Sequence, residues 1–345
     1  MSEELSVDKT LTQLWRRGIY RGEAARLAAL ANSSERRGPE LRAFAQLAAL
    51  IEGTPLETQQ ARVSQTSSVA VLALAAQAWS AAAGGQLQDS DLHLAAMDRE
   101  VKSLQETSES EERKAATGAW ADYAAAECAY LAGASYTCRV HINKVLENPK
   151  CPKGLVLQAT IRMAFLEGMA KPDAAARHMD AAVRLAERAG SLHDRVYSLT
   201  YAALFSMLRG SLADAKKRFE RVVREGDTGV PQSYCVLSRL FLACITGPDS
   251  LTDANAHIAE GIRCAAQSGD YVCYVLLIIM GARLYMAMGS AADAIATLSN
   301  GIAQLKHARG TSAAAPLIAE RENLHEHVGE HEYSLAIQKI IEDMQ

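Results

Sequence analysis

The sequence is poor in residues that break helices or favour strands. Only 8 of its 345 residues are proline, and aromatic residues make up 6% of the chain. Alanine and leucine, which are strong helix formers, fill most of the apolar positions. Because β-branched and aromatic residues favour strands, we expect a chain of helices without a β-sheet.

A large excess of one charge is also missing. The chain has 36 Lys and Arg residues against 40 Asp and Glu residues, which gives a net charge of −4. A general nucleic-acid binder needs a basic surface, so we expect no nucleic-acid partner. Charged residues form 22% of the chain and hydrophobic residues 49%. That balance is typical of a folded protein and excludes wholesale disorder.

Targeting and membrane-spanning segments are not visible. The first residues, MSEELSVDKT, lack the basic region and apolar run of a secretory signal. The most apolar stretch, 271–289, contains Arg283 and is too short to cross a membrane comfortably. Seven cysteines without a CxxC pair indicate free thiols in a reducing compartment. These features predict a cytoplasmic protein without membrane insertion.

Glycines recur at the ends of apolar helical runs, and their spacing is the strongest signal. One series differs in number by 35, 42, 37 and 42, and comprises Gly133, Gly168, Gly210, Gly247 and Gly289. A second series, interleaved with the first, comprises Gly190, Gly226, Gly269 and Gly310. Helix-pair repeats have periods of about 34 to 47 residues. Two series with one period predict two helices per unit, each ended by a left-handed glycine.

Residues at the predicted helix starts agree with this period. Pro152, Pro172 and Pro231 fall where a missing backbone N–H costs nothing. Four aspartates open the predicted second helices, where a negative charge suits the helix dipole: Asp173, Asp214, Asp253 and Asp293.

The residues around these glycines resemble the tetratricopeptide family over about 115–310. Seven positions before the marker glycine, where that family has a small residue, stand Ala126, Ala203 and Ala282, with Ile161 and Leu240 departing from the pattern. Ala294, Leu298 and Gly301 match the small–large–small pattern of its second helix, and Ala215, Phe219 and Val222 approximate it. The resemblance implies an all-α, right-handed solenoid of about seven to eight antiparallel helix pairs.

We expect three regions in one continuous solenoid. Residues 1–114 form irregular helical repeats, with helices predicted at 11–31, 41–53 and 69–83. Residues 115–310 form the tetratricopeptide-like pairs, and 311–345 form a polar capping pair, as a solenoid end requires.

The resemblance also implies which side chains line the concave groove, because first helices face it in that family. The positions carried over are Trp120, Tyr123, Glu127, Gln158, Arg162, Tyr197, Thr200, Tyr234, Arg283 and Met286, with Tyr130, Phe165, Leu237, Phe241, Leu276 and Ile279 beside them. Aromatic residues, Arg and Met are favoured at interface hot spots. The competing interpretation is inter-repeat core for the aromatics and a neighbouring glutamate as the partner of Arg162 or Arg283.

Sequence motifs for catalysis are missing. The chain has no GxxxxGK[ST], no GxGxxG after a strand and no GxSxG. His325, His327 and His331 are the best metal candidates, but HExxH spacing is not met and Gly329 interrupts the run. We therefore expect no metal, no cofactor and no enzymatic activity.

The function predicted from these features is a scaffold or adaptor that binds a protein or peptide on the concave face. Two alternatives stay open. The solenoid is a regulatory sensor for a small ligand or signalling peptide, or it is a structural subunit that forms a homo-oligomer.

Overall fold

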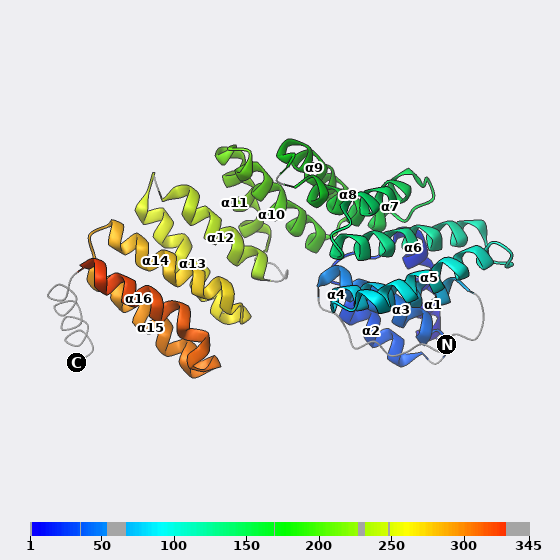
Figure 1. Ribbon diagram of the computed structural model, residues 1–345, viewed down its shortest axis with the longest axis horizontal. Helices are drawn as coiled ribbons and strands as arrows, with labels where there is room; N and C mark the ends of the chain where they lie inside the picture. Colours follow the sequence, from blue (N-terminus) through cyan, green and yellow to red (C-terminus); the bar gives the residue numbers. More distant parts are fainter. Residues whose placement is uncertain are drawn as a thin grey trace. The chain divides into compact units, whose positions relative to one another are not determined.

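The computed structural model describes residues 2–34, 36–53, 67–168, 170–226, 232–247 and 249–328. The described chain is all helical, without strands, and sixteen α-helices follow one another along it (Figure 1). Within each unit most consecutive helices pack against each other. The chain forms two compact units, residues 1–209 (unit 1) and 210–345 (unit 2). The predicted boundaries after 114 and 310 stay predictions.

Unit 1 holds the first ten helices. The helices are α1 (Ser2–Arg17), α2 (Ala24–Ser33), α3 (Gly38–Glu52), α4 (Ser68–Ala83), α5 (Leu87–Leu104), α6 (Glu111–Leu131), α7 (Ser135–Glu147), α8 (Lys153–Glu167), α9 (Pro172–Ala189) and α10 (Leu192–Leu208). Of these, α4, α6, α8 and α10 contact one another in turn and form a row that we call the inner layer. The core of unit 1 runs through α1 to α8. The N-terminal helices therefore belong to the same core as the first tetratricopeptide-like pairs.

Unit 2 repeats the pair arrangement over a separate core, built mainly from α12 to α15. Its elements are α11 (Leu212–Gly226), α12 (Gln232–Thr246), α13 (Leu251–Ser268), α14 (Tyr271–Ala287), α15 (Ala291–Arg309), a short 3₁₀ turn (Thr311–Ala314) and α16 (Ala315–Val328). The small–large–small residues of its second helices are buried: Ala215, Phe219, Val222, Ala294, Leu298 and Gly301. Each helix of the described part is too short or too polar to span a bilayer.

The prediction of one helix over 11–31 is wrong. Helix α1 ends at Arg17 and α2 begins at Ala24, so a non-helical segment, 18–23, separates them. Gly18 and Gly22 have φ of 80° and 87°. This left-handed region ends helices and strongly favours glycine.

Most glycines of the two series have the positive φ expected of a glycine that ends a helix. They are Gly133, Gly168, Gly190, Gly210, Gly269, Gly289 and Gly310. Gly226 and Gly247 do not, which corrects the prediction for these two. At Gly226 close packing is the reason for glycine, since a Cβ there would lie 2.0 Å from Sγ of Cys235.

The helix-start residues that the structure describes are confirmed. Pro172 is the first residue of α9, and Pro152 directly precedes α8. The four aspartates lie in the first turns of α9, α11, α13 and α15. Pro231 lies outside the described residues.

Segment 18–23 packs on the first turn of α8, and this contact yields a stability prediction. A Cβ on Gly154 would lie 2.6 Å from the Ile19 carbonyl oxygen and 3.0 Å from that of Arg17. Both are backbone atoms, so Gly154→Ala should lower the free energy of unfolding by about 1–3 kcal/mol.

Gly118 is the matched control, because it is also helical and a Cβ there meets nothing within 4 Å. Gly118→Ala should stabilise the protein by about 0.5–1 kcal/mol through helix propensity alone. Urea unfolding followed by tryptophan fluorescence measures both. Equal stabilisation by the two substitutions would show that segment 18–23 does not press on α8.

Candidate partner-binding surfaces

The aromatic residues predicted for the groove in the middle of α6 lie in the core of unit 1. Trp120 has 0% of its surface exposed and Tyr123 has 4%. The Trp120 ring centroid lies 6.4 Å from that of Phe44 in α3 and 6.3 Å from that of Tyr123. Trp15 of α1 packs edge-on to Phe44 at 5.0 Å. The face predicted to hold a partner is therefore covered here by the N-terminal helices of the same chain.

Arg162 and Glu127 form a two-pronged ion pair between α8 and α6. The Arg162 Nε and Nη2 atoms lie 2.7 Å and 2.5 Å from the two carboxylate oxygens of Glu127, which is 1% exposed. Burial lowers the pKa of the Arg162 guanidinium, but the charge and hydrogen bond of Glu127 together with the nearby Tyr123 and Tyr130 outweigh burial and raise that pKa above its usual value. The pair is neutral overall, so the anionic partner predicted for Arg162 is a neighbouring glutamate.

Buried Asp194 ties segment 18–23 to α8 and α10. Its carboxylate accepts hydrogen bonds from Gln158 Nε2 at 2.8 Å and from the backbone N–H of Arg21 at 3.0 Å. The Arg21 guanidinium lies 3.7 Å from the ring centroid of Tyr197. Thr200 is fully buried and donates to the Val196 carbonyl in its own helix. Gln158 and Thr200 therefore face the interior of the unit.

A half-buried cluster remains on α6, α8 and α10, which we call the arginine–aromatic surface: Tyr130, Arg162, Phe165, Tyr197 and Tyr201. The Phe165 ring lies 4.8 Å from that of Tyr201, which lies 4.7 Å from that of Tyr197. The Arg162 guanidinium lies 4.0 Å from the Tyr130 ring centroid. Arginine over an aromatic ring is a favourable cation–π arrangement, so these side chains are held in place with part of their surface open.

In unit 2 the predicted groove residues of α14 are open. Val272, Leu276, Ile279, Arg283 and Met286 recur at helical spacing along one face, which we call the α14 stripe. Val272 is 52% exposed and Leu276 is 44% exposed, while Ile279 and Met286 are half-buried. The sequence rule missed Val272, because it begins at Leu276, thirteen positions before Gly289.

The neighbours of α14 in this layer are α12 and α16. Arg283 binds Glu320 of α16 through two contacts of 2.6 Å and 3.0 Å, although its side chain is 69% exposed. Cys244 of α12 lies 3.8 Å, sulfur to sulfur, from Met280 of α14. Tyr234 is half-buried on α12. The layer α12–α14–α16 therefore carries the open part of the predicted set in unit 2.

The histidine group is described only in part. His325 is exposed on α16, while the side chain of His327 and all of His331 lie outside the described residues. In the described part of the chain, no three His, Cys, Asp or Glu side chains are grouped so that they could hold a metal ion.

Comparison with known proteins gives structural likeness only. No family model matches the sequence, and neither does any curated protein. The crystal structure of a Rap protein complexed with Competence and Sporulation Factor covers 95% of this chain and 99% of its own, at 12% identity and a TM-score of 0.51. NprR in complex with its cognate peptide NprX covers 94% and 90%, at 11% identity and a TM-score of 0.47. The likeness to the Rap protein supports the tetratricopeptide-like fold.

Proposed function

We propose that this chain is a non-catalytic scaffold that binds a protein or peptide partner on its inner-layer helices. The observation that carries the proposal is the α14 stripe, where two aliphatic side chains are about half exposed on a helix that is apolar apart from Arg283. Contiguous apolar surface on a folded protein marks an interaction site. The Rap structure of the same fold holds a bound factor, which supports a peptide as the partner.

The stripe fits a segment with apolar side chains at helical or extended spacing. Its one charged member, Arg283, is neutralised by Glu320, so the surface does not select a strongly charged partner. In unit 1 the arginine–aromatic surface offers further apolar contacts. Its arginine, Arg162, is paired with Glu127, and the neighbouring Arg21 is paired with Asp194. Of the predicted set, Arg162, Tyr197, Tyr234, Arg283 and Met286 are the side chains that keep open surface.

A photo-crosslinker placed at Leu276 tests the proposal. We expect benzoylphenylalanine at this position to capture a partner from native extract, because the side chain is exposed in the middle of the α14 stripe. Leu92 of α5 is the matched control, since it is 69% exposed but stands outside the inner layer. When the crosslinker stands at Leu276, an added Val272→Glu substitution should abolish capture, whereas an added Leu92→Glu substitution should leave it unchanged. Mass spectrometry identifies the captured chain.

The alternatives predict different products. Crosslinking of the chain to itself at Leu276 would favour a self-assembling subunit, and equal capture at both positions would contradict a specific partner surface. A regulatory sensor that changes shape on peptide binding is the second candidate, favoured by the bound factor in the Rap structure. The cytoplasmic location, the possible homo-oligomer and the exclusion of nucleic acid stay predictions.

A further inference from the structure

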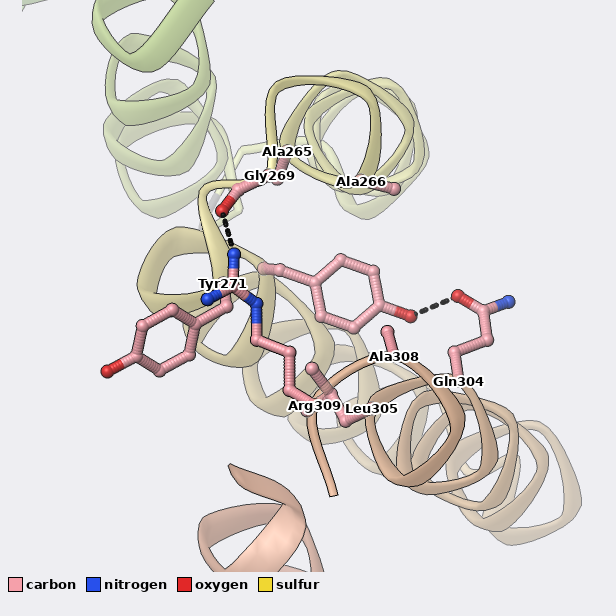
Figure 2. Close-up of a pocket in the computed structure, with 9 residues that line it drawn as sticks. Ala265, Ala266, Gly269, Tyr271, Gln304, Leu305, Ala308 and Arg309 are labelled. Atoms are coloured by element: carbon pink, nitrogen blue, oxygen red, sulfur yellow. Dashed lines mark hydrogen bonds between the residues drawn. The ribbon is translucent and has the colours of Figure 1, made fainter. Parts of the chain in front are cut away.

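A small notch opens in unit 2 where three helix ends meet (Figure 2). Its volume is about 130 Å³. The last turns of α13 and α15, the first turn of α14 and the glycine between α13 and α14 surround it. The lining residues are Ala265, Ala266, Gly269, Tyr271, Tyr274, Gln304, Leu305, Ala308 and Arg309. No segment of the described chain fills this space.

The floor of the notch is apolar and fixed. Ala265, Ala308 and Gly269 have little or no side chain, and this leaves the space open. Tyr274 and Leu305, each 5% exposed, form the buried end of the notch. The Tyr274 hydroxyl donates to Oε1 of Gln304 at 2.5 Å. Burial raises the pKa of Tyr274, so the phenol is neutral at physiological pH.

The rim of the notch carries a guanidinium with spare hydrogen-bonding capacity. Arg309 donates to the Gly269 carbonyl at 3.3 Å and lies 5.2 Å from the Tyr271 ring centroid (Figure 2). Among the described residues no carboxylate pairs with it, whereas Arg239, Arg263 and Arg283 of the same unit are paired with glutamates. A guanidinium has five N–H donors, so most of those on Arg309 are available to a ligand.

The local charge favours an anion. Lys306 lies in the last turn of α15 with Arg309. Oε1 of Gln304 accepts the tyrosine hydroxyl, and its amide nitrogen points away from the tyrosine and from Arg309 (Figure 2). The guanidinium of Arg309 is therefore the donor that a bound anion would meet. Arginine binds carboxylates through paired N–H donors, so a carboxylate beside an apolar group suits this site.

We propose that the notch binds the C-terminal residue of a peptide, with an aliphatic side chain in the notch and the terminal carboxylate on Arg309. A cavity of about 150 Å³ accommodates benzene, so the notch has room for a side chain up to the size of leucine. A phosphate would meet the arginine but leave the apolar floor uncovered. The choice of a peptide over a free small acid rests on the proposed function.

The test uses the full chain and the probe acetyl-Gly-Gly-Leu, with a free carboxylate or as its C-terminal amide. Binding is followed by the NMR amide shifts of Gly269, Tyr271 and Ala308. We expect the free acid to bind at least about tenfold more tightly than the amide, because only the acid pairs with the guanidinium. Arg309→Gln should remove that difference, and Ala308→Leu should abolish binding by filling the notch.

Arg263→Gln is the matched control. Arg263 lies on α13, about one turn before the notch residue Ala266, and it is already paired with Glu260. It should bind the acid like the unmodified chain. Equal binding of acid and amide, or unchanged binding by Arg309→Gln, would overturn the proposal. Equal affinity for acetyl-leucine and the tripeptide would overturn the peptide as the ligand and assign the notch to small acids.

The notch and the proposed function can fail separately. Capture of a partner at Leu276 without tripeptide binding would contradict peptide binding in the notch and still support the scaffold function. Tripeptide binding that Ala308→Leu abolishes, in a chain that captures no partner at Leu276, would support the notch and contradict the scaffold function.

Discussion

Glu127→Gln should lower the free energy of unfolding of unit 1 by about 3–5 kcal/mol, since it leaves a largely buried arginine without its counter-charge. Glu127 is 1% exposed and the Arg162 side chain is 20% exposed, so water does little to replace the lost carboxylate. The three tryptophans, Trp15, Trp79 and Trp120, all lie in unit 1. Their fluorescence during urea unfolding therefore reports on this unit specifically.

Glu320→Gln is the control, because it breaks a pair of the same two-pronged geometry in which the arginine is 69% exposed. An exposed pair contributes about 0–1 kcal/mol. Unit 2 has no tryptophan, so its unfolding is the part of the circular-dichroism change that tryptophan fluorescence does not follow. Losses of similar size at the two sites would show that burial does not set the strength of the Arg162–Glu127 pair.

Trp120→Ala should cost about 3–5 kcal/mol of stability, the range for truncating a large buried aromatic residue. Trp120 is fully buried against Phe44 and Tyr123. If it were a partner contact on an open face, as the sequence predicted, the same change would alter stability by no more than about 0.5 kcal/mol and weaken binding instead. Urea unfolding followed by the fluorescence of the other two tryptophans separates these outcomes.

Trp120→Phe should cost less than the alanine substitution. Phenylalanine keeps an aromatic ring against Phe44, and it removes an indole N–H that has no hydrogen-bond partner among the described residues. An unmatched buried donor costs about 1–3 kcal/mol, so its loss offsets part of the smaller ring's poorer packing. Equal losses for the two substitutions would mean that the ring itself contributes little to the core.

Periodicity was enough to predict the helix pairs. A glycine that ends a helix is local, because its left-handed conformation depends on a few neighbouring residues, as at Gly133 and Gly289. Close packing between helices is not local. Gly226 occurs with the same period as its neighbours in the series, but the sulfur of Cys235 explains it, and no spacing rule reveals that contact.

The candidate site was predictable for unit 2 and much less so for unit 1. The same positions before the marker glycine select Leu276, which is open, and Trp120, which is covered. The difference arises from α1, α3 and segment 18–23, whose contacts with α6, α8 and α10 join residues far apart in sequence. The notch at Arg309 was missed because it depends on what three helix ends leave unfilled, and a repeat pattern carries no information on empty space.

The contact between Arg21 and Asp194 spans 173 residues, and this has a consequence during synthesis. Nearest-neighbour pairs in a helical stack can form as each one emerges. Segment 18–23 cannot, because the carboxylate that receives it is made roughly 9 to 35 s later at ordinary translation rates. Segment 18–23 must wait through that interval without the carboxylate that accepts the Arg21 backbone N–H. The part of unit 1 that is made early is thus among the last to reach its final contacts.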